Sequence, residues 1–137
     1  MKAYCLDTFA VIAYLRDEKS ASKVLELLKE AQSKRALLFM HGVNLGELYY
    51  TVAREEGEEE ADIIYGRVID FPINFIYDLK GDMLITAARI KSKYRLSYAD
   101  SFSAAAAILK NAILITGDQE FKPLEKEGII KLLWLEK

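Results

Sequence analysis

The chain has 137 residues, of which 52% are hydrophobic and 29% charged, and a formal net charge of −2. This length and composition suit one globular domain, so we expect a single domain over residues 1–137. No apolar run approaches the ~18 residues that span a bilayer, and Asp7 interrupts the first apolar stretch too early for a secretion signal. These features exclude a disordered chain and predict a soluble, cytoplasmic protein without a membrane partner.

The charges and the rare residue types limit the possible chemistry. Residues 55–62, the acidic block, hold six acids and no base, so the rest of the chain carries 19 basic against 15 acidic residues and can present basic surface to a polyanion. The block itself is typical of a solvated turn and helix face. Cys5 and His41 are the only residues of their types, which excludes an internal disulfide, a cysteine zinc cage and a histidine-rich metal site. Any metal site must therefore use oxygen ligands.

Strand-like and helix-like segments alternate along the chain. In chain order, we expect a strand over 2–6, a helix over 8–15, a helix around 24–31, a strand over 37–41, a helix over 45–52, a strand over 73–77, helices over 83–95 and 102–109, a strand over 112–116 and a strand within 129–135. The strands at 2–6 and 112–116 are continuous apolar runs, as in parallel sheets covered on both faces, whereas the helices repeat apolar residues with period 3.6. This alternation predicts an α/β fold with an open, mostly parallel five-stranded sheet between helices.

Two acids follow predicted strands. Asp7 comes directly after the first strand, and Asp118 follows the strand over 112–116 across Gly117. In open α/β sheets the carboxyl ends of the strands form the edge where ligands bind. We therefore expect both carboxylates to lie at the ligand-binding edge.

Two further acids stand at predicted helix starts. Glu47 lies three residues after Asn44, and Asp100 three residues after Ser97, which is the spacing of a capping box. These acids therefore also have a purely structural interpretation, because a carboxylate near a helix N-terminus stabilises the helix by ~0.3–1 kcal/mol. The helix after Asp100 is apolar on all sides, which predicts that it is buried and that its N-terminus borders a cleft.

Convergence of these four acids would have an electrostatic cost. Two carboxylates about 4 Å apart repel each other by roughly 4 kcal/mol at an effective dielectric constant of about 20. Proteins relieve such repulsion by protonating some of the acids or by binding a divalent cation, and an all-oxygen site suits Mg²⁺ or Mn²⁺. Metal-assisted hydrolysis of a phosphodiester needs neither histidine nor cysteine, so this chemistry fits the residues available.

The acids occur in four segments whose order is informative: Leu6-Asp7-Thr8-Phe9-Ala10-Val11, Asn44-Leu45-Gly46-Glu47-Leu48, Tyr98-Ala99-Asp100-Ser101-Phe102-Ser103-Ala104-Ala105 and Ile115-Thr116-Gly117-Asp118-Gln119-Glu120-Phe121. Together they resemble the four acidic motifs of PIN-domain ribonucleases, and most closely those of VapC-type toxins. The resemblance implies a three-layer α/β/α fold and a metal-dependent endoribonuclease that acts on single-stranded or loop RNA, with a small antitoxin protein as partner. Phe9 departs from the small polar residue usual two places after the first acid.

The resemblance also assigns roles to the site residues. It implies that Asp7, Asp100 and Asp118 lie next to Mg²⁺ or Mn²⁺, that Glu47 binds metal through water or orients the nucleophile, and that Thr116 braces the site. Two alternatives are a non-catalytic PIN-like module that binds RNA or a protein, and an aspartyl-phosphate phosphatase. The phosphatase pattern needs a second acid at position 9, where this chain has phenylalanine.

Weaker candidates accompany this set. Two basic pairs on the helix over 83–95, and an aromatic and basic pair after Glu47, are candidates for contacts with RNA phosphates and bases, although a solvated helix face explains them too. These residues are Arg89 with Lys93, Lys91 with Arg95, and Tyr50 with Arg54. Asp82 is expected to cap a helix, and His41 to have a structural role. Apolar residues on the helices predict a homodimer and a docking surface for the antitoxin: Tyr14, Leu15, Leu25, Leu27, Leu28, Ile63, Ile64 and Tyr65.

Overall fold

The computed structural model describes residues 1–136 and contains one five-stranded sheet in that range. Its strands are β1 (Lys2–Leu6), β2 (Ala36–His41), β3 (Asn74–Ile76), β4 (Ile113–Thr116) and β5 (Leu132–Trp134). The strand order is β3-β2-β1-β4-β5, and every neighbouring pair is parallel. The expected parallel sheet is confirmed, and its two central strands, β1 and β4, are the two continuous apolar runs. Their carboxyl ends lie next to each other because the two strands are parallel neighbours, and the order of the strands reverses between them, which is where ligands bind in open α/β sheets.

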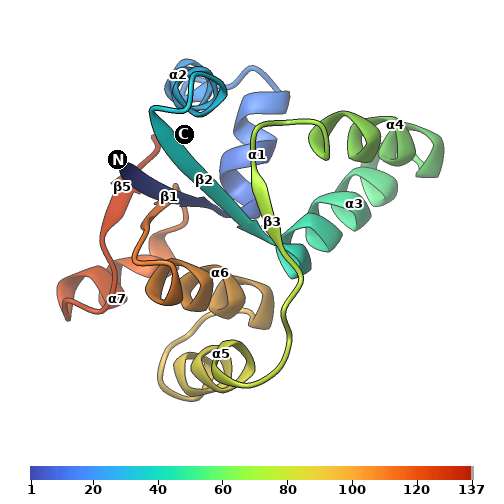
Figure 1. Cartoon of the computed structure of the whole chain (residues 1–137). Helices are drawn as coiled ribbons and strands as arrows, with labels where there is room; N and C mark the ends of the chain where they lie inside the picture. Colours follow the sequence, from blue (N-terminus) through green and yellow to red (C-terminus); the bar gives the residue numbers. More distant parts are fainter. Residues whose placement is uncertain (137) are drawn as a thin grey trace.

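Helices cover both faces of the sheet (Figure 1). They are α1 (Thr8–Leu15), α2 (Ala21–Gln32), α3 (Gly42–Glu56), α4 (Glu58–Val68), α5 (Asp82–Lys93), α6 (Tyr98–Leu109) and α7 (Lys122–Lys126), with a 3₁₀ turn η1 (Gln119–Phe121) before α7. Helices α1 to α4 pack on one face, and α5 to α7 on the other. The structure therefore has the three-layer α/β/α architecture that the sequence predicts. None of the helices within residues 1–136 is long and apolar enough to cross a bilayer.

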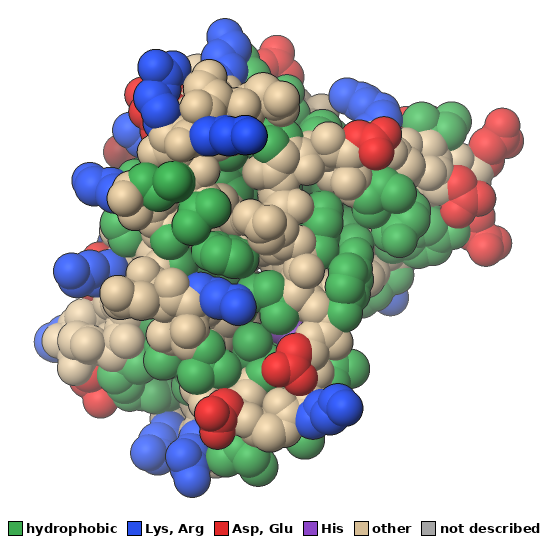
Figure 2. Space-filling model, viewed as in Figure 1, with side chains coloured by type: hydrophobic (Ala, Val, Ile, Leu, Met, Phe, Trp, Pro, Cys, Tyr) green, Lys and Arg blue, Asp and Glu red, His purple; other side chains and the backbone are tan. Residues whose placement is uncertain are grey.

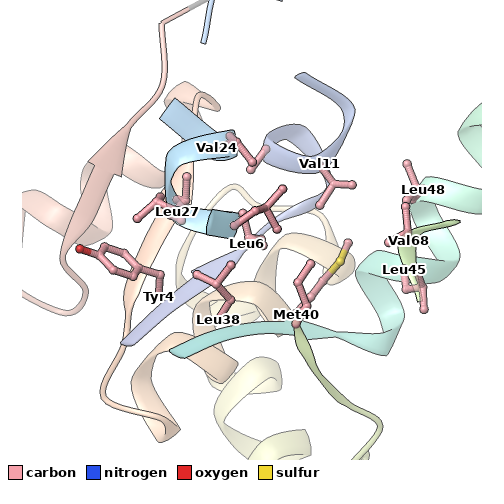
Figure 3. Packing of buried hydrophobic residues seen from close by; sticks show 14 of the residues in the cluster. Tyr4, Leu6, Val11, Val24, Leu27, Leu38, Met40, Leu45, Leu48 and Val68 are labelled. Carbon is pink, nitrogen blue, oxygen red and sulfur yellow. The ribbon is translucent and has the colours of Figure 1, made fainter. Parts of the chain in front are cut away.

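Alternation along β1 divides the core into two clusters. Tyr4 and Leu6 pack with Leu38 and Met40 of β2 beneath α1 to α4, as Figure 3 shows, whereas Cys5 faces α6 on the other side. Side chains of a strand point alternately to the two faces, so a strand buried on both faces must be apolar at every position. The helix after Asp100 is buried as predicted, since residues 101–107 of α6 are all buried.

Helix α3 begins earlier than the sequence predicts. It starts at Gly42, directly after β2, and its N-cap is His41, whose Nδ1 accepts a hydrogen bond from the backbone of Val43 at 3.0 Å. The His41 Nε2 atom lies 2.9 Å from the Asp78 carbonyl oxygen, and burial lowers the pKa of the imidazole. The capping-box interpretation of Glu47 is therefore wrong, because that residue lies in the second turn of α3. His41 has the expected structural role.

Other local expectations also need correction. Asp82 does not cap α5, since Gly81 is the N-cap and Asp82 is the first helical residue. Helix α5 ends at Lys93, so Arg95 lies beyond it and the pair with Lys91 does not share a helix face. Leu27 and Leu28 of α2 are buried and contribute no surface for association.

The acidic block contains the end of α3 and the start of α4, a helix that was not predicted from the sequence. Glu58, Glu59 and Glu60 form the first turn of α4, where their charges interact favourably with the helix dipole. Figure 2 shows acidic side chains gathered at the tip of the molecule where α3 meets α4, and basic side chains around α5 and on the opposite side. The block is therefore a solvated helix end, as expected.

Candidate active site

Asp7 occupies the position predicted for it, at the carboxyl end of β1. Its side chain is 1% exposed and caps α1, with Oδ1 accepting a hydrogen bond from the backbone of Ala10 at 2.8 Å. Oδ2 accepts a hydrogen bond from the hydroxyl of Thr116, on the neighbouring strand β4. Burial, together with the negative charges of Asp100 and Asp118, raises the pKa of Asp7 to about 8, although the two hydrogen bonds oppose this effect.

Thr116 and Asp118 form one rigid turn at the end of β4. The Thr116 hydroxyl accepts a hydrogen bond from the Asp118 backbone at 3.0 Å while it donates to Asp7. Asp118 in turn caps η1, with Oδ1 accepting from the Glu120 backbone at 2.9 Å. Gly117 is required between them, because a Cβ atom at this position would lie within 3 Å of the Phe9 ring and 2.7 Å from the Leu135 carbonyl oxygen.

Asp100 lies at the N-terminus of α6 and is half-buried. The predicted cap is confirmed, since the Ser97 hydroxyl accepts a hydrogen bond from the Asp100 backbone at 3.1 Å. Burial, together with the negative charges of Asp118 and Glu47, raises the pKa of the Asp100 carboxyl to about 7. The neighbouring Asp118 side chain also favours the protonated form of Asp100.

Glu47 reaches the same region from the second turn of α3. Its Oε1 atom accepts a hydrogen bond at 2.5 Å from the hydroxyl of Thr8, the residue that follows Asp7. Asn44, one turn earlier on α3, is fully buried; its carbonyl oxygen and its Oδ1 each lie 3.1 Å from the Thr8 hydroxyl, and its amide nitrogen donates to the Ala99 carbonyl at 3.2 Å. The contributions of Thr8 and Asn44 were not predicted. Each is a second polar residue beside the acid of its motif, which does not by itself indicate that the two side chains meet.

The structure thus brings together the four acids that the sequence singles out. These acids come from four separate segments and are called here the acid set: Asp7, Glu47, Asp100 and Asp118. The negative charges of Asp100 and Asp118 raise the pKa of Asp7, and those of Asp118 and Glu47 raise the pKa of Asp100. Four surface hollows within residues 1–136 contain none of these acids; one of about 760 Å³ lies around the amino ends of β1 and β4 and includes Lys2, Asn111 and Lys131. The expected cleft is therefore not among these hollows.

The donor chemistry of the acid set fits a divalent cation. Its donors are all oxygens, and two of the carboxyl groups have raised pKa values because they are buried near other negative charges. Within residues 1–136, no three acidic, histidine or cysteine side chains are already arranged as ligands of one ion. Neighbouring carboxyl groups favour the protonated form when no cation compensates their charge, as the raised pKa values of Asp7 and Asp100 indicate. Binding of an ion by this set would therefore involve side-chain movement and deprotonation of Asp7 and Asp100.

The weaker candidates lie at the surface. Arg89, Lys91 and Lys93 are exposed on α5, and Figure 2 shows basic side chains around this helix. Tyr50 is 49% exposed, and the Arg54 guanidinium lies 5.3 Å from the centre of its ring. The role of these exposed residues in RNA binding stays a prediction.

Comparisons with known proteins agree on one family. The family model described as the PIN domain matches residues 4–127. The fold is similar to that of VapBC2 from Rickettsia felis bound to a DNA fragment from their promoter, with a TM-score of 0.74, 20% identity and coverage of 98% of this chain and 99% of that chain. It is also similar to a toxin-antitoxin complex from Klebsiella pneumoniae, with a TM-score of 0.68, 18% identity and coverage of 98% and 99%.

A third similar structure is that of VapC20 from Mycobacterium tuberculosis, described as a sarcin-ricin loop cleaving toxin. It has a TM-score of 0.61 and 15% identity, and the match covers 81% of this chain and 86% of that chain. Among curated protein sequences, none matches the chain. The family model covers most of the chain, so the chain belongs to the PIN domain family.

Proposed function

We propose that residues 1–137 form a single PIN domain that acts as a Mg²⁺- or Mn²⁺-dependent endoribonuclease, and that the protein is the toxin of a toxin–antitoxin pair. The observation that carries the proposal is the acid set at the carboxyl edge of the sheet, in which Asp7 and Asp100 have pKa values raised by burial and by neighbouring negative charge. Strongly perturbed carboxyl groups that converge from separate segments are typical of catalytic sites. Similarity to VapBC and VapC structures supports the toxin assignment.

The members of the acid set have different roles in the proposed site. Asp7 is oriented from both sides by Thr116 and by the α1 backbone, so it can present one fixed carboxylate to an ion. Asp118, and Asp100 once it has lost its proton, would supply further oxygen ligands. A divalent cation bound there would lower the pKa of a water molecule and stabilise negative charge on the scissile phosphate. Glu47, held by Thr8, would bind through water or orient the attacking water.

The proposed partners follow from the comparisons and from exposed apolar side chains. The Klebsiella pneumoniae structure is a toxin-antitoxin complex, and the VapC20 structure is that of a toxin cleaving the sarcin-ricin loop. We extend these partners to this chain as a small antitoxin protein and an RNA substrate. Exposed Leu25, Ile63 and Tyr65 support a protein partner and a homodimer, because apolar groups at the surface are available for association.

The test of the proposed activity is cleavage of a panel of structured RNAs in Mn²⁺ and in EDTA. We expect cleavage only in Mn²⁺, and we expect Asp7→Asn and Asp100→Asn each to abolish it while the protein stays folded. Asp82→Asn is the matched control, because Asp82 is an exposed helix-terminal aspartate that does not contribute to the raised pKa of either acid. Full activity of Asp7→Asn or Asp100→Asn would contradict the proposed site. Metal-independent RNA binding without cleavage would favour the non-catalytic alternative.

A further inference from the structure

The hydroxyl of Thr8 lies among more acceptors than it can serve. Its oxygen is 2.5 Å from Glu47 Oε1 and 3.1 Å from both the carbonyl oxygen and Oδ1 of Asn44. A hydroxyl has one proton, so it donates to one of these three acceptors at a time. The shortest contact is to the carboxylate, and a hydrogen bond to an ionised group is about twice as strong as one between neutral groups. The proton of Thr8 is therefore directed to Glu47.

Asn44 cannot rotate to relieve this competition. Its Nδ2 atom donates to the carbonyl oxygen of Ala99, which only a donor can approach at 3.2 Å. This bond fixes which side of the amide is oxygen and leaves Oδ1 facing Thr8. It also links α3 to the residue immediately before Asp100. Thr8, Asn44 and the Ala99 carbonyl therefore connect the three elements that carry Asp7, Glu47 and Asp100.

The contact between Thr8 and Glu47 is sheltered from water. Thr8 is 7% exposed and Asn44 is fully buried, whereas Glu47 is half-buried. A hydrogen bond between groups of such low exposure orients a side chain more strictly than one in water does. A carboxylate has two oxygens, so donation to Oε1 leaves Oε2 for a water molecule or an ion. The negative charge of Glu47 acts on Asp100, which places this carboxylate beside the rest of the acid set.

We propose that Thr8 is a positioning residue, whose hydroxyl holds the Glu47 carboxylate in place within the acid set. Asn44 supports this arrangement because its side chain keeps α3 against the N-terminus of α6. The inference rests on the proposed function, because it assumes that the acid set binds a divalent cation. It parallels the contact on the other side of the site, where the Thr116 hydroxyl orients Asp7. Partners of this kind, which orient a ligand without touching the metal, typically contribute 10- to 100-fold to metal affinity.

The test compares Mn²⁺ affinity by titration calorimetry, without RNA, in the full chain. Thr8→Val removes the hydroxyl at almost constant volume, and we expect it to weaken Mn²⁺ binding by roughly 10- to 100-fold. Thr8→Ser keeps the hydroxyl and should stay within about threefold of the parent. The matched control is Thr86→Val, which makes the same change at a half-buried position on α5, and its affinity should not change. A urea titration in EDTA verifies that each variant is folded.

A double-variant cycle separates positioning from general structural support. Glu47→Gln removes the group that Thr8 orients, so adding Thr8→Val to Glu47→Gln should weaken Mn²⁺ binding by less than about twofold further. If Thr8→Val does not fold, Thr8→Ala provides the same cycle. Equal Mn²⁺ affinity of Thr8→Val and the parent would overturn this inference alone, and so would a loss in Thr8→Ser as large as that in Thr8→Val. Absence of Mn²⁺ binding by the parent protein would instead overturn the proposed function.

Discussion

Replacement of Asp7 by asparagine tests whether the buried, ionisable Asp7 carboxyl group lowers the free energy of unfolding near neutral pH. The asparagine keeps the shape of the side chain, and its Oδ1 can still accept from the Ala10 backbone, so the cap of α1 remains. The change removes the one group whose pKa burial raises from 3.8 to about 8. An acid with a raised folded-state pKa stabilises the native state less as pH rises, because the unfolded chain ionises first.

The size of the effect follows from the two pKa values. At pH 4 the group is protonated in the native state and about half ionised in the unfolded chain, so it costs less than about 1 kcal/mol. At pH 7 the unfolded chain has lost a proton that the native state retains, which corresponds to at most about 4 kcal/mol at about 1.4 kcal/mol per pH unit. In metal-free buffer, Asp7→Asn should therefore lie within about 1 kcal/mol of the parent protein at pH 4 and gain stability relative to it as pH approaches 7.

Urea unfolding in EDTA at several pH values measures this difference, with the fluorescence of Trp134, the only tryptophan, as the signal. Taking the difference between variant and parent removes the opposite contribution of His41, whose lowered pKa favours folding at higher pH. The control Asp82→Asn, at an exposed position, should change the free energy of unfolding only slightly. If Asp7→Asn is destabilised equally at pH 4 and pH 7, the reasoning is refuted, and capping of α1 is the main role of this carboxylate.

Two further predictions concern the surroundings of the site. Gly117→Ala should destabilise the protein by about 1–3 kcal/mol in urea unfolding, because the added methyl group meets the Phe9 ring and the Leu135 carbonyl. Gly66→Ala, where a Cβ atom meets nothing within 4 Å, is its control, and equal effects of the two changes would contradict the steric argument. Replacing Arg89, Lys91, Lys93 and Arg95 together with alanine should weaken RNA binding equally across sequences and reduce its salt dependence by up to about 0.7 per lost phosphate contact. Unchanged salt slopes would show that this basic surface does not contact RNA.

The sequence predicts the parts of the site that depend on local order. Asp7 follows a strand and caps the next helix, and the hydroxyl of Ser97 caps α6 beside Asp100, so short-range spacing was enough for both. The start of α3 was predicted three residues too late, because His41 ends β2 and caps α3 without an intervening loop. An imidazole that accepts from a backbone amide is not among the usual N-cap signals.

The contribution of Thr8 could not be predicted from the chain alone. It depends on Glu47, 39 residues away, and on an asparagine whose orientation is set by a carbonyl oxygen 55 residues further along the chain. Such contacts depend on how α1, α3 and α6 pack together, which periodicity does not specify. For the same reason, the sequence could not predict that the Phe9 ring lies against Gly117.

Because β1 pairs with β4, the site can be completed only after most of the chain has been synthesised. Asp7 belongs to the first strand made, but the hydroxyl that orients it belongs to a residue 109 positions later. A growing chain on the ribosome therefore carries its first acid long before the strand that completes it has emerged, and until then one side of β1 has no partner. Contacts so distant in sequence form slowly because a long loop must close first. A fragment that ends before β4 would contain two or three of the acids but not the edge of the sheet that brings them together.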